Sequence, residues 1–214
     1  MPLRGRRCVS MAFLPDGDKL LVGSSDEFIS CVSTRGHSIG PMFSMWQSAL
    51  WDMMALSDIY VDMTAPRDSY DFIACGTGLL HRFRVYNGEL LESRTVVVST
   101  RDSGGWCLAH VPITNEIARG CDLQIAMYSV GEHAITRSMR LPGDEGAVWT
   151  LSYDCRLRSL FAGRAAWGAW LICSVENYLL HSHENDDDFF ATVVCSLYLD
   201  DVGCFVYGDS RGSV

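Results

Sequence analysis

The stretch Trp149-Thr150-Leu151-Ser152-Tyr153, followed by Leu160-Phe161-Ala162-Gly163, decides the fold expected for this chain. The first segment alternates in character, which is typical of a β-strand with one face turned to a core. The second segment is apolar and ends in glycine, and Asp154 begins the more polar residues between them. Two such runs separated by a short turn predict a pair of antiparallel strands.

This pattern occurs five times in the 214 residues, and each copy has a leading residue and a closing glycine. The leading residues are Val9, Trp51, Trp106, Trp149 and Val194, and the closing glycines are Gly23, Gly76, Gly120, Gly163 and Gly208. The two markers are 14 residues apart in four copies and 25 apart in the second, which predicts an insertion of 11 residues within 57–69. Successive glycines are 53, 44, 43 and 45 residues apart. A period of about 40–45 residues is expected for a four-stranded propeller blade.

Two further apolar runs follow the glycine in each of the first four copies. The third runs are 28–32, 79–85, 123–130 and 167–175, and the fourth runs are 39–43, 89–92, 134–139 and 178–181. Four short strands per repeat, without a helical period, predict an all-β chain.

At two places the sequence resembles the WD-repeat family. Gly208-Asp209-Ser210-Arg211-Gly212-Ser213-Val214 is similar to the family's Gly-Ser-x-Asp-Gly-x-hydrophobic passage, and residues 14–23 resemble its first hairpin. The Trp-Asp dipeptide at the end of the third strand is missing from every copy, and so is the Gly-His pair before the first strand. The resemblance implies a β-propeller that acts as a protein-binding scaffold, but the family's Asp–His–Ser–Trp network is not assigned here.

The expected fold class is therefore all-β: a β-propeller of four-stranded antiparallel blades, with four full blades and a partial fifth. The blades are expected at 8–45, 46–101, 102–142, 143–187 and 188–214. Because seven blades are typical of the family, the sequence predicts a partial propeller with open edges. Such edges predict assembly with other propeller segments.

Composition argues against several function classes. The net charge is −9 and Arg4, Arg6 and Arg7 form the only basic cluster, so no nucleic-acid partner is expected. No uncharged run reaches 18 residues, so no membrane span is expected. The nine cysteines include no C-x-x-C pair. Most lie in apolar runs, as do Cys8, Cys75, Cys107, Cys173 and Cys195, which predicts buried free thiols in a reducing compartment. We expect the cytoplasm, with the nucleus as the alternative.

One cluster has the residue types of a metal site. His181-Ser182-His183-Glu184 precedes the aspartates 186–188, but it falls at the end of a fourth run and in the loop that follows, which favours a solvated polar loop. His110 occupies a position held by Phe13, Tyr153 and Tyr198 in other copies, so we expect a core or half-buried histidine. No catalytic, cofactor-binding or metal-binding residue is assigned, and no cofactor is expected.

Two surface features are candidates for partner binding. The leading tryptophans are expected to pack between blades, whereas Trp167 or Trp170 is a candidate exposed contact. Loops with Asp26-Glu27, Asp144-Glu145 and 186–188 are expected to share one face, with Arg101 and Arg164 in other loops. The hypothesis is an acidic face that favours a basic peptide, and the alternative is an ordinary solvated rim.

The function that follows is a non-catalytic scaffold for protein–protein interactions, whose partner the sequence does not name. A propeller enzyme or metal-binding protein that uses His181–Asp188 is one alternative. A truncated fragment without independent activity is the other.

Overall fold

The computed structural model consists of antiparallel β-sheets. It describes residues 7–14, 17–25, 28–35, 39–44, 50–55, 69–76, 79–86, 89–97, 105–122, 124–142, 146–164, 170–174, 179–183, 192–199, 201–212 and 214. Those residues contain eighteen strands and no helix, in two compact units, Met1–Arg101 and Asp102–Val214. We call these the N-terminal and the C-terminal unit.

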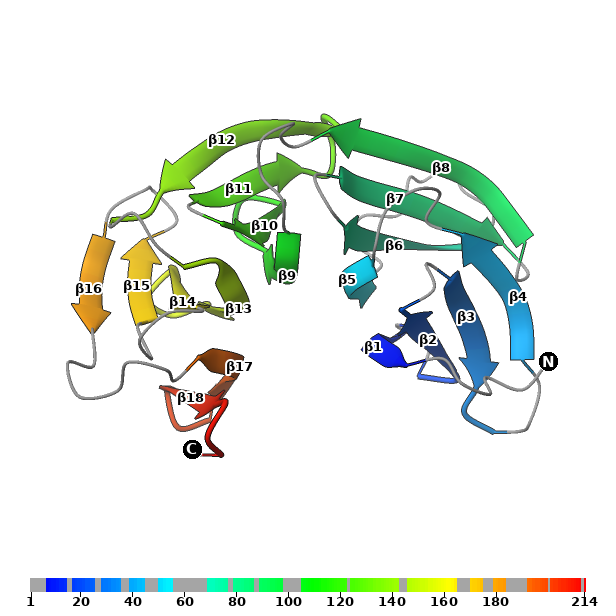
Figure 1. Cartoon of the computed structure of the whole chain (residues 1–214). Coiled ribbons are helices and arrows are strands. Elements are labelled where there is room, and N and C mark those ends of the chain that lie inside the picture. Colours follow the sequence, from blue (N-terminus) through cyan, green and yellow to red (C-terminus); the bar gives the residue numbers. More distant parts are fainter. Residues whose placement is uncertain are drawn as a thin grey trace. The chain divides into compact units, whose positions relative to one another are not determined.

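The N-terminal unit contains two four-stranded sheets in which each strand pairs with the next along the chain (Figure 1). The first sheet consists of β1 (Cys8–Phe13), β2 (Lys19–Ser24), β3 (Phe28–Ser33) and β4 (Ile39–Ser44). The second sheet consists of β5 (Leu50–Ala55), β6 (Ser69–Gly76), β7 (Leu79–Tyr86) and β8 (Glu89–Val97). The two sheets contact each other through β1 and β5.

The C-terminal unit contains two four-stranded sheets and one two-stranded sheet of the same topology. The first consists of β9 (Gly105–Val111), β10 (Glu116–Cys121), β11 (Gln124–Ser129) and β12 (Ala134–Arg140). The second consists of β13 (Val148–Asp154), β14 (Ser159–Arg164), β15 (Trp170–Ser174) and β16 (Leu179–His183), and β17 (Val193–Leu199) and β18 (Cys204–Asp209) form the third. Here β13 contacts both β9 and β17, so successive sheets stack through their first strands.

These strands confirm the all-β, antiparallel prediction. Each of the eighteen overlaps one of the apolar runs expected from the sequence. The hairpin expected at residues 14–23 is formed, and Phe13 pairs with Leu20. Gly17 completes its turn with a φ of 68°, a conformation that glycine adopts without steric cost.

A β-bulge lies at the leading residue of every copy. In the sheet of β13 to β16, Val148 pairs with Arg164 and Thr150 pairs with Gly163, so Trp149 is the extra residue of the bulge. The same slip occurs at Val9, Trp51, Trp106 and Val194. Trp149 is exposed, so the expectation that it packs between blades is wrong. The side chains of Trp51 and Trp106 lie outside the described residues.

The residue before the bulge makes the contact between sheets instead. Val148 of β13 is buried against Gly120 of β10, and Val193 of β17 is buried against Gly163 of β14. A Cβ added to Gly120 would lie 2.8 Å from Val148 Cγ1, and one added to Gly163 would lie 2.4 Å from Val193 Cγ1. These closing glycines therefore leave room for the valine of the following sheet. We call Val148 and Val193 the contact valines.

The second copy departs from the expected alignment by one residue. Its first strand pairs Asp52 with Cys75 and Leu50 with Gly76, whereas elsewhere the residue after the bulge faces the closing glycine. Cys75, not Gly76, is therefore the structural counterpart of Gly120 and Gly163. The extra segment in this copy is ten residues long, not eleven. The sequence pattern placed Gly76 at the closing position of this copy, which is one residue past the position that pairs with Asp52.

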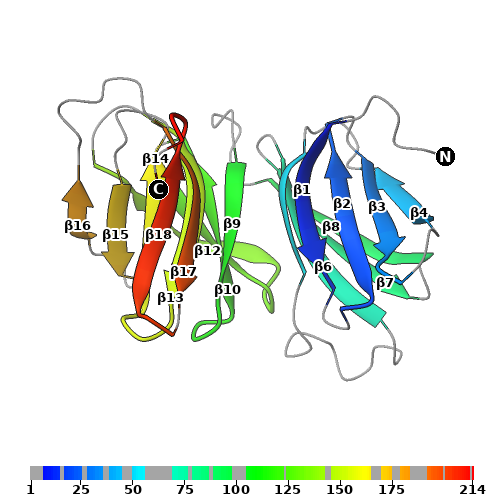
Figure 2. The same cartoon turned by 90° about the horizontal axis from the view of Figure 1, so that it is seen from below.

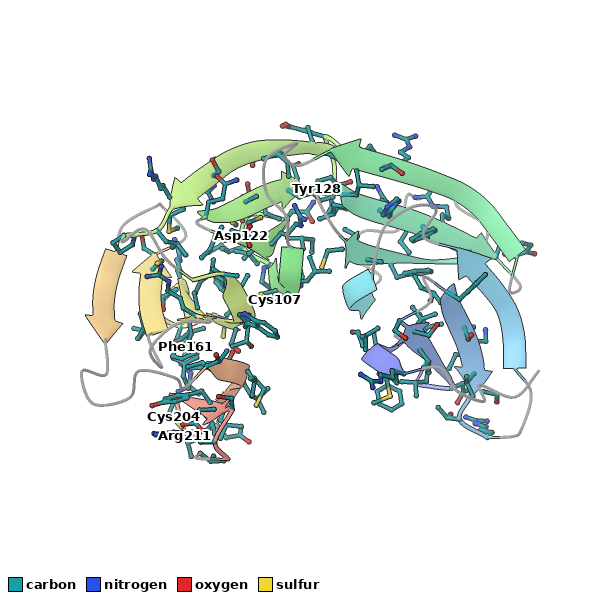
Figure 3. The ribbon with its side chains drawn as sticks, viewed as in Figure 1. Cys107, Asp122, Tyr128, Phe161, Cys204 and Arg211 are labelled. Carbon is teal, nitrogen blue, oxygen red and sulfur yellow. The ribbon has the colours of Figure 1, made fainter. Side chains whose placement is uncertain are left out.

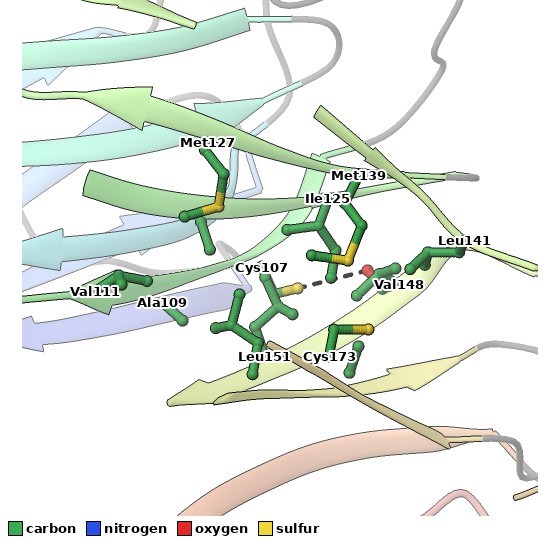
Figure 4. Close-up of a cluster of buried hydrophobic side chains, with 13 residues drawn as sticks. Cys107, Ala109, Val111, Ile125, Met127, Met139, Leu141, Val148, Leu151 and Cys173 are labelled. Atoms are coloured by element: carbon green, nitrogen blue, oxygen red, sulfur yellow. Dashed lines mark hydrogen bonds between the residues drawn. The ribbon is translucent and has the colours of Figure 1, made fainter. Parts of the chain in front are cut away.

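A core lies between the first two sheets of the C-terminal unit (Figure 4). It joins Cys107, Ala109 and Val111 of β9 to Leu151 and other side chains of the following sheet. The Cys107 thiol donates a hydrogen bond of 3.5 Å to the Val148 carbonyl. The N-terminal unit has its own core around Leu21, Ile29, Phe72 and Phe83.

The expectation of buried thiols is confirmed only for part of the nine cysteines. Cys31, Cys75, Cys107, Cys121 and Cys173 are buried and are in no disulfide. Burial raises the pKa of Cys173 to about 11, so this thiol stays protonated at neutral pH. Cys8 and Cys195 are exposed, which corrects the expectation for these two.

Polar and aromatic contacts join the last two sheets of the C-terminal unit. The Ser196 hydroxyl lies 2.8 Å from the Thr150 hydroxyl and 2.7 Å from the Ser152 hydroxyl. Phe161 stacks on Phe205 and Tyr207, with centroids 5.1 and 5.9 Å apart (Figure 3 labels Phe161). Thr150 and Ser152 both face Ser196, because residues two apart in a strand share one face of the sheet.

Candidate functional site

Three hairpin turns of the C-terminal unit lie at the same end of their sheets (Figure 2). They join β9 to β10 at 112–115, β13 to β14 at 155–158, and β17 to β18 at 201–203. Two of them are in direct proximity, because the Arg156 guanidinium lies 3.3 Å from the point where a Cβ on Gly203 would be.

The turns have similar backbone conformations. Asn115, Arg158 and Gly203 each lie nine residues after the leading residue, with φ values of 57°, 50° and 67°. Asp154 holds the middle turn, because its Oδ1 accepts hydrogen bonds from the backbone N–H groups of Arg156 at 2.8 Å and Leu157 at 3.2 Å. An aspartate that bonds its own backbone two residues on is a common turn former.

Each turn exposes one aliphatic side chain. Ile113, Leu157 and Val202 are exposed, at seven or eight residues after the leading residue of their copies. Single exposed aliphatics are ordinary, but three at equivalent turns form a pattern. We call Ile113, Leu157 and Val202, with the neighbouring Arg156 and Arg158, the turn row.

The middle of the turn row is positively charged. Arg156 and Arg158 are exposed on the middle turn, and Asp201 is exposed on the last turn. Beneath them, partial desolvation raises the pKa of the Tyr198 phenol, and its hydrogen bond with Asp154 raises it further. Tyr198 therefore stays protonated at neutral pH and ties β17 to the Asp154 turn.

The turn row is a surface that sequence reasoning missed. The signal was present, because an aliphatic residue stands among turn residues in three consecutive copies. This signal was overlooked because turns were expected to be polar. Equivalent positions of the copies were also compared in the strands and not in the turns.

The expected acidic face cannot be placed. Asp26-Glu27, Asp144-Glu145 and 186–188 lie outside the described residues, as does Arg101. Arg164 is described and is not a loop residue: it ends β14 and is buried. Its guanidinium donates hydrogen bonds to the carbonyls of Pro142 at 3.0 Å and Gly146 at 3.5 Å, so it anchors the connection between β12 and β13.

The candidate metal cluster is only partly visible. His181 and His183 lie on β16, paired with Ile172 and Trp170 of β15, so they share one face of an outer strand. Their side chains and residues 184–188 lie outside the described part of the chain, and so do Trp167 and the side chain of Trp170. Among the described residues, no three His, Cys, Asp or Glu side chains are grouped as metal ligands.

His110 is half-buried, as the sequence predicts. Burial lowers its pKa below the ordinary value of 6.5, so the ring is neutral at pH 7. A search of the described residues for a helix long and apolar enough to span a membrane finds none.

Comparison with known proteins supports the fold and gives no family. No protein-family model matches the chain, and no curated protein matches its sequence. Among solved structures, 1282 chains are similar, so the fold is too widely shared to indicate one function. One of them is the crystal structure of Raptor from Chaetomium thermophilum, with a TM-score of 0.74 and 14% identity. The match covers 91% of this chain but 18% of the Raptor chain, and at this identity it shows likeness of fold alone.

Proposed function

We propose that this chain is a segment of a WD-repeat-like β-propeller and acts as a non-catalytic scaffold for protein–protein contacts. The turn row carries the proposal. Its aliphatic side chains offer apolar contact and have no group that could act as an acid, base or nucleophile. Stacked sheets hold the three turns on one rigid base, as is common for binding loops.

The propeller arrangement is supported by how the sheets stack within each unit. In every described pair of neighbouring sheets of one unit, the first strands are in contact: β1 with β5, β9 with β13, and β13 with β17. In a propeller the first strands line the central channel, so this contact is the expected one. A crystal structure with first strands that do not surround a common axis would contradict the arrangement.

The chemistry of the turn row indicates the kind of partner. Leu157 stands between Arg156 and Arg158, so an apolar segment with acidic neighbours would complement it. Such a segment would bury the three aliphatic side chains and keep its carboxylates near the two guanidiniums.

A photo-crosslinking experiment tests the proposal. A benzophenone amino acid replaces Leu157 in one version of the protein and exposed Val214 in another, and cross-linked proteins are identified by mass spectrometry in the producing cells. We expect a protein that is captured from position 157, is not captured from position 214, and is lost when Ile113→Ser and Val202→Ser are added. Because both residues are exposed, these changes should leave the melting temperature within about 1 °C.

Two results would contradict the scaffold function. Identical capture from positions 157 and 214 would show that the turn row has no selectivity. A stoichiometric metal ion in the purified protein, lost on substitution of His181 and His183, would favour the metal-binding alternative instead.

A further inference from the structure

Two sheet faces, one at each end of the series of repeats, are apolar and uncovered. The head face consists of Met11 and Phe13 of β1 with Leu20 and Val22 of β2, which pair directly as Met11 with Val22 and Phe13 with Leu20. The tail face consists of Cys195, Leu197 and Leu199 of β17 with Cys204 and Val206 of β18. None of these residues is charged.

The repeat shows what normally covers the head face. Leu151 and Tyr153 of β13 occupy the positions of Met11 and Phe13, two and four residues after the bulge. They pack against β9 of the preceding sheet, and Leu151 is 7% exposed. Met11 is 63% and Phe13 64% exposed. The head face therefore has the residues of a sheet interface and lacks the preceding sheet.

The same comparison applies to the tail face. Ser152 of β13 occupies the position of Leu197 and is 8% exposed, because β17 of the following sheet covers it. Leu197 is 60% exposed. The tail face therefore lacks a following sheet, although its side chains are more apolar than those that are covered in β13.

The chemistry of the two faces matches. Where Leu151 and Tyr153 are covered, the covering strand β9 supplies Cys107, Ala109 and Val111. The tail face has Cys195, Leu197 and Leu199 at these same positions, and all are apolar. In contrast, Thr150, Ser152 and Asp154 are covered by the polar Ser196 and by Tyr198. An apolar tail face fits Met11 and Phe13 and does not fit a strand such as β17.

We propose that the tail face binds the head face of a second copy of this chain. The contact repeats the stacking of β13 on β9, with β1 of one copy against β17 of the other. It rests on the stacking of the sheets and does not require the turn row. Since the two faces differ, the contact is heterologous and continues from copy to copy unless a ring closes.

The contact valines identify a pair of thiols for the test. Val148 lies beside Cys107, since both approach the same point above Gly120, at 2.8 Å for Val148 Cγ1 and 2.6 Å for Cys107 Sγ. Cys8 has the position of Val148 in β1, and Cys195 has the position of Cys107 in β17. Cys8 of one copy is therefore expected beside Cys195 of the next, and both thiols are exposed in a single chain.

Sedimentation of two blocked variants tests the proposal. Phe13→Glu blocks the head face and Leu197→Glu the tail face, and burial of an unpaired carboxylate should weaken association by about 100-fold or more. We expect the unmodified chain to form dimers and larger species with rising concentration, and each variant alone to be monomeric. An equimolar mixture should give a dimer and nothing larger, because one intact head and one intact tail remain.

Three controls make the outcome decisive. Leu157→Glu, in the turn row, should associate like the unmodified chain, which separates this proposal from the scaffold function. Circular dichroism should show unchanged folding of both blocked variants, since Phe13 and Leu197 are largely exposed. A short bismaleimide should link Cys8 to Cys195 in peptides from the dimer, and Cys8→Ser should abolish this link.

Other results would overturn the proposal. A chain that stays monomeric, or blocked variants that still dimerise alone, would exclude a head-to-tail contact. Monomers whose faces become covered only in a longer chain with further repeats would assign both faces to that chain instead of a second copy.

Discussion

At the scale of single residues, Asp71 illustrates how the N-terminal unit holds charge inside a sheet. Asp71 of β6 is buried and bonds the guanidiniums of Arg82 and Arg84 on β7; Arg84 Nε donates to Asp71 Oδ1 at 2.9 Å. Buried ion pairs are costly to break, because the remaining charge has lost its water. The sequence shows these residues but not their pairing, which depends on register.

We expect Asp71→Asn to lower the free energy of unfolding by about 3–5 kcal/mol, since it leaves two arginines without this carboxylate. Asp18→Asn is the matched control. Asp18 pairs with Arg35 at 2.6 Å, but the two side chains are 44% and 79% exposed. Its loss should therefore cost no more than about 0.5 kcal/mol. Urea unfolding measures both, and equal effects would refute the distinction.

Two histidines predict that stability falls on mild acidification. Burial lowers the pKa of His81 in β7 and of His110 in β9 below 6.5. The unfolded chain then binds protons at a higher pH than the folded one. The contribution of these two neutral histidines to the free energy of unfolding is complete above the pKa of histidine in the unfolded chain. It is lost as the pH falls toward their lower pKa values in the folded chain. Glu116 acts at lower pH: burial alone would raise its pKa, but hydrogen bonds from Thr136 and Thr114 and the charge of Arg137 lower it below 4.5.

The urea midpoint should therefore decrease between about pH 7.5 and about pH 5.5, where His is the side chain that titrates. His110→Gln should reduce the slope for the C-terminal unit, and His81→Gln should reduce it for the N-terminal unit. Half-buried His133 is not a suitable control for these substitutions, because it lies in a turn with a φ of 55°. A pH slope unchanged by either substitution would show that these rings are not the groups responsible.

At the scale of elements, each repeat begins with a strand that contains a bulge. In β13 and β17 the residue just before the bulge packs against a glycine of the preceding sheet. The sequence predicted both markers and all the strands they enclose, because alternation and turn residues are local properties. It misjudged the role of Trp149, because an extra residue in a strand has no signal in hydrophobicity. It also aligned Gly76 wrongly, because register is fixed by pairing with β5 and not by the glycine itself.

Gly163→Ala should destabilise the C-terminal unit by about 1–3 kcal/mol, because the new methyl overlaps Val193 and Thr150. Adding Val193→Ala removes the nearest overlapping atom, Val193 Cγ1, and leaves Val193 Cβ and Thr150 Cγ2 in place, so the double substitution should cost less than the sum of the two single ones. The control is Gly131→Ala in a turn with nothing within 4 Å of the new methyl, and it should change stability by no more than about 0.5 kcal/mol. Additive costs at Gly163 and Val193 would contradict the contact.

At the scale of the whole molecule, the order of the repeats was predictable and the uncovered faces were only partly so. Open edges were expected from the number of repeats. The sequence did not predict which side chains lie on those uncovered faces, because an apolar residue such as Leu197 looks like any core residue in the sequence. The turn row was missed for the opposite reason: Leu157 is apolar in a segment expected to be polar.

Head-to-tail association predicts a melting temperature that depends on protein concentration, since partner binding stabilises the folded state. At a concentration about 100 times the dissociation constant the gain is about 2.7 kcal/mol. Differential scanning fluorimetry over a dilution series should show this rise for the unmodified chain and a flat line for Leu197→Glu. A flat line for both would remove the thermodynamic support for self-association.

The bulge also determines where the chain tolerates a change in length. Ten additional residues are accommodated between β5 and β6, in a hairpin connection, without altering how those strands pair. Removing Trp149 would leave Val148 and Leu151 two residues apart, so both would still share one face of a regular strand, with Val148 against Gly120 and Leu151 in the core. Long insertions in the connections and loss of the extra bulge residue should thus leave the stacking intact, whereas deletion of Ser152 should uncouple neighbouring sheets, because it would turn either Leu151 or Tyr153 to the other face.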